Sequence, residues 1–201
     1  MKFIELVIDE SQEFFAIDAI SIVSDPAIES EFIALKNQKQ KIQFKQVNEE
    51  KRLLIGPALI PDLPIYRQDS NGEEFYVYFS KKTVRKAMEL FSTQSNQNNW
   101  TLEHDQNIQG LSVVESWIVE SKEQDKSALY GLDVPVGSWL ISCKVNNDAI
   151  WEKYVKSGDV LGFSIEGWFM DKFQVIQNNE KLMRSIEDLC KTHSPVRKDI
   201  V

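Results

Sequence analysis

The sequence predicts a strand-rich α+β domain, and three observations carry that prediction. Short segments with alternating or aromatic-rich apolar residues recur along the chain, as is typical of strands. Few stretches have helical spacing, and residues 81–93 are the clearest of them. Hydrophobic residues make up 42% of the 201 residues and include 11 Phe, enough for the core of one domain. We therefore expect about seven strands and two or three helices.

In the first half of the chain, strands are predicted wherever apolar residues alternate or form a short run: residues 2–9, 41–48, 51–61 and 73–79. The spacing in residues 14–36 is ambiguous, and Pro26 is expected to interrupt it. The prolines at 57, 61 and 64 predict an extended, loop-like segment before residue 73. The helix at 81–93 is expected to begin after Ser80, whose hydroxyl can cap it.

The second half continues the pattern, with strands predicted at 100–104, 110–120, 138–145, around Ser164 and at 171–176. A helix is expected at 148–157, because Asn146 or Asn147 can cap its start and Gly158 stands where a glycine often ends a helix. Residues 180–191 have helical spacing and predict a C-terminal helical tail.

Charge and cysteine content exclude several classes of protein. The net charge of −8 would repel nucleic acid, and no run of 18 apolar residues predicts a membrane span. The N-terminal segment carries acids among its apolar residues, unlike a signal peptide. Cys143 and Cys190 are far apart and lack the spacing of metal ligands, which favours a reducing compartment without a disulfide framework.

The segment GDVLGFSIEGWF, residues 158–169, places Ser164 between two glycines on a predicted strand. Phe163 and Ile165 would face the core, whereas Ser164 and Glu166 would share the other face. The spacing G-x-S-x-x-G differs from the nucleophile elbow of α/β-hydrolases. Ser164 is therefore either a nucleophile held on a strand or an ordinary residue of a half-buried strand.

A serine nucleophile needs a base, usually histidine, and the chain has two histidines. His193 lies in the polar tail and is expected to be solvated. His104 lies at the predicted end of a strand, from which an imidazole could reach an open cleft. We expect His104 and Ser164 on neighbouring strands facing one groove; the alternative is a surface histidine at the edge of a loop.

The third group of such a site must be acidic, because no further histidine is available. Glu115 is the first candidate, since it interrupts the face formed by Leu111, Val113, Trp117 and Val119, and a carboxylate on an apolar face needs a partner. Glu166, on the same face as Ser164, is the rival, and an acid of the tail is a further alternative. Other chemistry has little support: no paired histidines suggest zinc, no glycine-rich phosphate loop is present, and Cys143 has the surroundings of a buried hydrophobe.

Five motifs in order, AIDAISIVSDPAIE, LEHD, VVESWIVE, GSWLISCKV and VKSGDVLGFSIEGWF, resemble the XkdF-like serine proteases of tailed phages and prophages. These are similar to the prohead maturation proteases and the herpesvirus assemblins. The resemblance covers roughly residues 1–175. It implies a mostly β, barrel-like fold with a few peripheral helices, over a domain at 1–177 followed by a helical tail at 178–201.

The resemblance also implies a function, a prohead maturation serine endopeptidase that cleaves scaffold and major capsid proteins during head assembly. Its histidine precedes its serine, so His104 would be the general base and Ser164 the nucleophile; the third member varies. The enzyme would act in the cytoplasm of the bacterial host, inside the assembling procapsid, without a cofactor or metal, and could form a homo-oligomer. The alternative is a non-catalytic structural or scaffolding component of the phage head.

Overall fold

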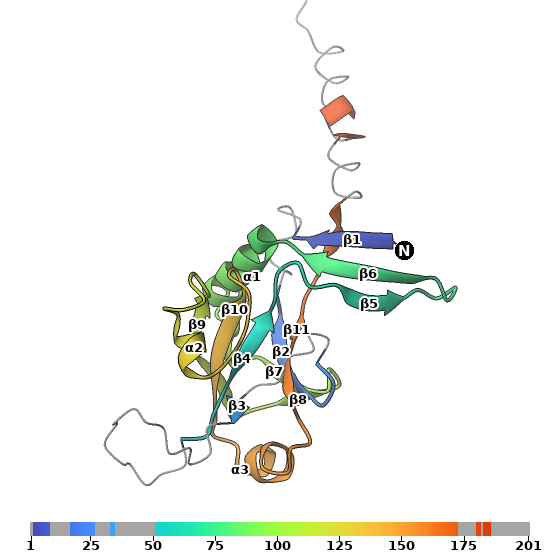
Figure 1. Cartoon of the computed structure of the whole chain (residues 1–201). Helices are drawn as coiled ribbons and strands as arrows, with labels where there is room; N and C mark the ends of the chain where they lie inside the picture. The colour runs from blue at the N-terminus through green and yellow to red at the C-terminus, as the bar shows by residue number, and fades with distance from the viewer. Residues whose placement is uncertain are drawn as a thin grey trace, which may run out of the picture.

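The computed structural model describes residues 2–8, 17–26, 33–34, 51–172, 180–181 and 183–185. These residues form a mixed α+β fold with many strands and few helices, which confirms the predicted class (Figure 1). The strands assemble into three four-stranded sheets.

Each sheet joins strands from distant parts of the chain, in these orders. The first is β12 (Met170–Asp171), β1 (Lys2–Val7), β6 (Glu74–Phe79) and β5 (Ile65–Gln68). The second is β3 (Ile33–Ala34), β4 (Leu53–Leu59), β10 (Trp139–Val145) and β9 (Leu111–Ile118). The third is β11 (Gly162–Glu166), β2 (Ala19–Val23), β7 (Trp100–Leu102) and β8 (Gln106–Ile108). The first sheet extends away from the other two in Figure 1.

The fold was expected to be barrel-like, but the described strands form three separate sheets and no closed barrel. Strands β4 and β11 approach each other closely, yet they belong to different sheets and no ladder joins them. Pro57 removes one backbone donor from β4, and the register of β4 with β10 shifts between Trp139 and Leu140. The likeness to the assemblin fold therefore stays a prediction.

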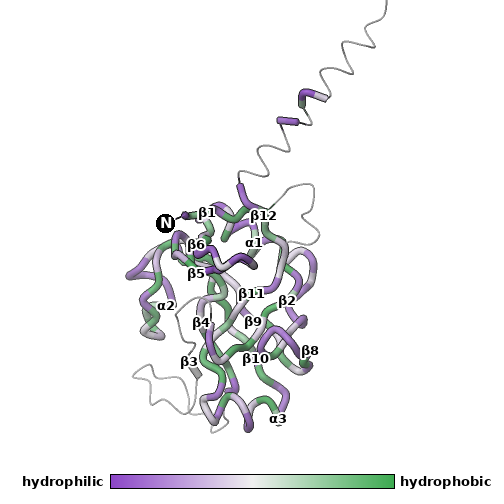
Figure 2. The backbone as a smooth tube through the Cα atoms, turned by 90° about the vertical axis from the view of Figure 1, so that its right-hand side faces the viewer, coloured by the Kyte–Doolittle hydropathy of each residue, from purple (hydrophilic) through white to green (hydrophobic). Residues whose placement is uncertain are grey.

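A single large core lies between the sheets and α1 (Lys81–Thr93). Val84, Ala87 and Phe91 on α1 are fully buried, and the Phe91 ring lies 5.4 Å from that of Trp139 on β10. Figure 2 shows hydrophobic residues along the strands in the middle of the molecule and hydrophilic residues in many outer turns. The helical spacing at 81–93 thus reflects real burial of one helix face.

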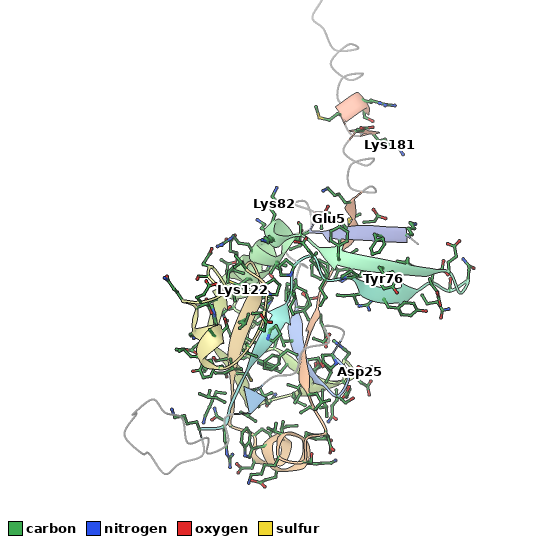
Figure 3. The ribbon with its side chains drawn as sticks, in the orientation of Figure 1. Glu5, Asp25, Tyr76, Lys82, Lys122 and Lys181 are labelled. Carbon is green, nitrogen blue, oxygen red and sulfur yellow. The ribbon has the colours of Figure 1, made fainter. Side chains whose placement is uncertain are left out.

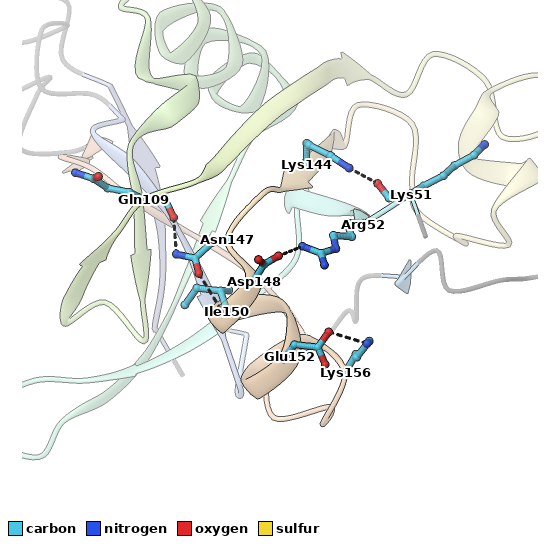
Figure 4. A network of polar contacts seen from close by, with 9 residues as sticks. All are labelled: Lys51, Arg52, Gln109, Lys144, Asn147, Asp148, Ile150, Glu152 and Lys156. Atoms are coloured by element: carbon cyan, nitrogen blue, oxygen red, sulfur yellow. Dashed lines mark hydrogen bonds and ion pairs between the residues drawn. The ribbon is translucent and has the colours of Figure 1, made fainter. Parts of the chain in front are cut away.

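Two helix starts are capped as predicted. The Ser80 hydroxyl accepts a hydrogen bond from the Thr83 N–H at the start of α1. Asn147 accepts one from the Ile150 N–H at the start of α3 (Asp148–Ile150), while its amide donates to the Gln109 carbonyl (Figure 4). The helix continues as a π-helical turn, η3 (Trp151–Val155), and Gly158 follows with a left-handed φ of 81°.

Short elements were the ones that the sequence did not predict. Strands β5 and β8 and the one-turn helix α2 (Lys126–Leu129) lie in segments expected to be loops. The predicted strand at 41–48 lies outside the described residues. Of the predicted tail, residues 180, 181 and 183–185 are helical, and the remainder also lies outside the described part.

Candidate active site

Ser164 lies on β11, the edge strand of the third sheet among the described residues. Phe163 is buried in the main core and Ile165 packs against it, as the alternation predicts. Ser164 therefore points to the opposite face, where only 8% of it is exposed. The sequence predicts that Ser164 lies on a half-buried strand, but in the structure the residue is almost fully buried.

A row of three hydroxyl side chains crosses this face of the sheet. Ser164 pairs with Ser21 on β2, and Ser21 pairs with Thr101 on β7. Residues that pair directly across strands point to the same face, so all three hydroxyls lie on one side. All three residues are buried, and Ser21 has no exposed surface.

His104 lies in the tight turn between β7 and β8, at the strand end where it was predicted. Glu103 and His104 have left-handed φ values of 53° and 59°, and the Asp105 N–H donates to the Leu102 carbonyl at 3.1 Å. This geometry is a type I′ turn, which usually requires Asn or Gly. Two non-glycine residues in this conformation cost about 1 kcal/mol or more each, so other contacts must hold the turn.

Three hydrogen bonds hold the turn against β2. The Glu103 N–H donates to the Ile22 carbonyl at 3.1 Å, and the Ser24 N–H donates to the Glu103 carboxylate at 2.7 Å. The His104 N–H donates to the Ser21 hydroxyl at 3.0 Å. Since Ser21 is the direct partner of Ser164, these bonds place the backbone of His104 next to the serine strand.

The imidazole of His104 is paired with Glu166 on the serine strand. Its Nδ1 lies 3.0 Å from the Glu166 Oε1, and the same oxygen accepts a hydrogen bond from the Thr101 hydroxyl. Glu166 and Ser164 are two residues apart on one face, roughly 6.6 Å along the strand. The structure therefore brings Ser164, His104 and Glu166 to the same face of one sheet.

The expectation of neighbouring strands was wrong, because β2 lies between β11 and the turn that carries His104. The turn bridges this gap by curling over β2. Within the described part of the chain, the Ser164 hydroxyl makes no hydrogen bond, either to His104 or to another group. Hydrogen bonds at resting catalytic sites are often longer than in the working complex.

Glu115 lies in the second sheet and has different partners. Its carboxylate accepts a hydrogen bond from the Ser142 hydroxyl and lies 2.8 Å from the Lys126 Nζ. These two contacts, the one with Lys126 first, hold the pKa of Glu115 below its ordinary value. The side chain is 49% exposed.

A β-bulge explains why the predicted face of β9 was wrong. Ser142 pairs with Glu115, but Cys143 pairs with Val113, so Val114 is an extra residue. Before the bulge, the side chains of Leu111 and Val113 pack in the main core. After the bulge, Ile118 packs in the main core, whereas Trp117 and Val119 pack in a separate small hydrophobic cluster. Glu115 therefore does not interrupt the apolar face of the main core.

The lowered pKa of Glu115 gives a pH-dependent stability. A carboxylate whose folded pKa is depressed stabilises the fold above its unfolded pKa of about 4.5, and this contribution disappears as the pH falls through the folded value. We expect Glu115→Gln to lower the free energy of unfolding near pH 7 by less than about 1 kcal/mol, because the pair is half exposed. Urea unfolding of both proteins at pH 7 and pH 3 measures this difference, which should be smaller at pH 3; a difference that is unchanged or larger there would contradict it.

Cys143, a further sequence candidate, takes no part in this arrangement. His193 lies outside the described residues. Cys143 is fully buried in the main core, where desolvation raises its pKa, so its thiol stays protonated. Among the described residues, no three His, Cys, Asp or Glu side chains are placed to hold a metal ion, and no helix is long and apolar enough to cross a membrane.

Sequence reasoning missed Ser21 and Thr101. Their only signal was a polar side chain in alternation with Ile20, Ile22, Trp100 and Leu102, all of which are buried in the main core. That alternation predicts a polar face on each strand, but it does not show that the two strands are adjacent.

The comparison with protein families gives one match. The model of the family described as "Putative phage serine protease XkdF" matches residues 41–172, which include His104, Glu115, Ser164 and Glu166. The motif at 16–29 lies outside the matched range. No curated protein and no solved structure shows a significant match to this chain.

Proposed function

The chain belongs to the phage serine protease family XkdF, and from that premise we propose that it is a serine endopeptidase that cleaves scaffold and capsid proteins during prohead maturation. One observation supports this proposal above the others. The imidazole of His104 contacts a carboxylate through Nδ1 beside a serine hydroxyl with no hydrogen bond in the described structure. A carboxylate, an imidazole and a hydroxyl in this order are the parts of a catalytic triad.

In the proposed mechanism, Glu166 accepts a hydrogen bond from Nδ1–H of His104 and so keeps Nε2 free as the base. The Ser164 Oγ attacks the scissile carbonyl carbon, and its proton passes to Nε2. The imidazolium then gives this proton to the leaving amine, and the peptide bond breaks. Water, activated by the same imidazole, hydrolyses the acyl-enzyme and releases Ser164.

For the third member of the triad we propose Glu166 in place of Glu115. The Glu166 carboxylate contacts the imidazole directly, whereas Glu115 is engaged by Lys126 and Ser142 in another sheet. A carboxylate orients an imidazole only through a direct hydrogen bond, so the contact partner decides between the two acids.

The proposed setting follows from the family. The substrates are phage proteins, namely the scaffold and the major capsid protein, and cleavage takes place inside the assembling procapsid in the bacterial cytoplasm. The protease domain would comprise residues 1–177, and the tail at 178–201 would be a separate helical extension. The proposed chemistry uses groups of this chain alone.

Co-expression with the head proteins of the same phage tests the proposed function. Fragments of the scaffold and capsid proteins are followed by mass, with and without this chain. We expect new fragments only when the chain is present. If the wild-type chain cuts none of the co-assembled proteins, the reading as a non-catalytic head component becomes the better one.

Thr101 is expected to be a positioning residue for the proposed triad. Its hydroxyl donates to the oxygen of Glu166 that contacts His104, and the residue is buried. Thr101→Val removes this donor while keeping the shape of the side chain. We expect kcat to fall by up to about 10²-fold, as misplacement of a catalytic group can cause.

Thr101→Ser is the matched control, because it retains the hydroxyl and should restore most of the activity. The readout that separates positioning from simple destabilisation is the pH profile of kcat. Losing the donor to Glu166 should change the pH dependence of kcat in the valine variant only. Equal kcat and an unchanged profile in Thr101→Val would contradict the role of Thr101.

A further inference from the structure

The strands around Ser164 carry acidic side chains and no lysine or arginine. The segments that form the third sheet and its connections are residues 17–26, 99–110 and 160–169. His104 is the only residue in them that can carry a positive side-chain charge. Their acidic residues are Asp18, Asp25, Glu103, Asp105 and Glu166.

These acids lie on the sheet that carries the proposed nucleophile or in its connections. The Glu103 carboxylate accepts a hydrogen bond from the N–H of Ser24, and Asp25 is the next residue in the chain. The Glu166 carboxylate contacts the imidazole of His104, and Asp105 is the next residue there. Burial, together with the nearby charge of Glu166, raises the pKa of Asp18, so these two carboxylates also lie within electrostatic reach of each other. Figure 3 shows Asp25 beside the strands of this sheet.

The described lysines that precede the serine strand are engaged elsewhere. Lys156 Nζ lies 2.7 Å from the Glu152 carboxylate, and Lys153 Nζ lies 4.8 Å from the centre of the Tyr154 ring. Both belong to η3 or its C-terminal end, before β11 begins. Both contacts are with residues of the same helical segment and not with the acids of the β7–β8 turn.

A second observation points to a ligand site on the strand that carries Ser164. Ser164 is more than nine-tenths buried, yet its hydroxyl has no hydrogen-bond partner in the described structure. The hydroxyl oxygen is not fully covered, so it is reachable from the surface and can contact a bound substrate. Trp168, two residues after Glu166, is 68% exposed and offers apolar contact to the same ligand.

We propose that the substrate of this site is a polypeptide segment with lysine or arginine close to the cleaved bond. The inference rests on the proposed function, because it names the substrate class of the same site. Opposite charges on the site and the segment raise the rate of encounter and favour the bound state. Exposed pairs of this kind change affinity by about 1.5- to 5-fold per charge.

A mixed peptide library tests the inference because it offers the protein many different candidate cleavage sites at once. Digestion of a bacterial proteome with a protease specific for glutamate yields peptides that keep internal Lys and Arg. The wild-type chain is incubated with this library, and new termini are identified by mass. We expect Lys and Arg within three residues of the cut bonds to exceed their frequency in the library, and this excess to shrink in 1 M salt.

A pair of variants then assigns the preference to the acids of the third sheet. Asp25→Asn with Asp105→Asn removes two charges from the connections of this sheet, and both residues are exposed and outside the proposed triad. Glu73→Gln with Glu89→Gln removes two charges from the β5–β6 turn and from α1, which serves as the control. On a cleaved Lys-containing peptide, kcat/KM should fall about 2- to 25-fold for the first pair only.

The outcomes separate the substrate inference from the proposed function. Cuts without enrichment of Lys or Arg, or an equal loss in both variant pairs, would overturn the substrate inference while leaving the protease in place. No cuts by the wild type in any peptide or head protein would overturn both. Enrichment that is lost in the Asp25/Asp105 variant and kept in the control supports the inference.

Discussion

Ser164→Ala is expected to lower cleavage of the co-expressed head proteins by about 10⁶-fold, the size seen when the serine of a well-studied triad is removed. The reason is that the hydroxyl oxygen forms the bond to the scissile carbonyl carbon, and alanine has no atom in its place. Residual cleavage from substrate positioning, on the order of 10³-fold over water, would be invisible in an assembly assay.

The substitution should leave the fold intact. The Ser164 hydroxyl has no hydrogen-bond partner among the described residues, so its removal leaves no group unsatisfied. We expect the unfolding midpoint in urea to match that of the wild type. Ser142→Ala is the matched control, since Ser142 is also a buried strand serine but lies in the second sheet. Equal cleavage by wild type and Ser164→Ala would show that the nucleophile is assigned wrongly.

The longest elements could be predicted from the sequence because their periodicity reflects burial of one face. Helix α1 and strands β6 and β10 lie where the patterns predicted them. The faces of Phe163 and Ser164 were also correct, since alternation on a regular strand fixes which residues share a side. His104 was correctly expected at a strand end, from the polar residues that follow it.

The turn conformation of His104 could not be predicted. The pair Glu103–His104 lacks the Asn or Gly that usually signals a type I′ turn. The turn exists because β2 supplies a carbonyl and a hydroxyl, and Ser24 just after β2 supplies an N–H, and this segment lies some 80 residues earlier in the chain. Long-range contacts of this kind leave no local pattern in the sequence.

The predicted face of Glu115 was wrong for a different reason. A strict period of two along β9 places Glu115 on the face of Leu111 and Val113, but the extra residue Val114 reverses the sides of the strand after it. Nothing in the run of apolar and polar residues marks the bulge. The same period of two on β11, which has no bulge in its pairing with β2, correctly places Glu166 beside Ser164.

Replacing Glu166 or Glu115 by glutamine, and measuring kcat of each variant, decides which of the two carboxylates orients the imidazole of His104. Glu166→Gln is expected to lower kcat by about 10⁴-fold, because the amide can donate to Nδ1 and so stabilise the wrong tautomer of the imidazole. His104→Ala should lower kcat by nearly as much as Ser164→Ala, and the double variant should be no worse than either, since the two residues act as a unit. Fragment formation in the co-expression assay and single-peptide kinetics measure both effects.

Glu115→Gln is the matched control for this prediction, because it makes the same chemical change on the neighbouring sheet and removes a carboxylate bound by Lys126 and Ser142. It should leave kcat within about 2-fold of the wild type, since a weakened exposed pair changes stability by less than about 1 kcal/mol and does not reach the imidazole. The reverse result, a large loss in Glu115→Gln with full activity in Glu166→Gln, would assign the orienting role to Glu115. That result would require the β7–β8 turn to move His104 away from the third sheet, breaking the bond between its N–H and the Ser21 hydroxyl.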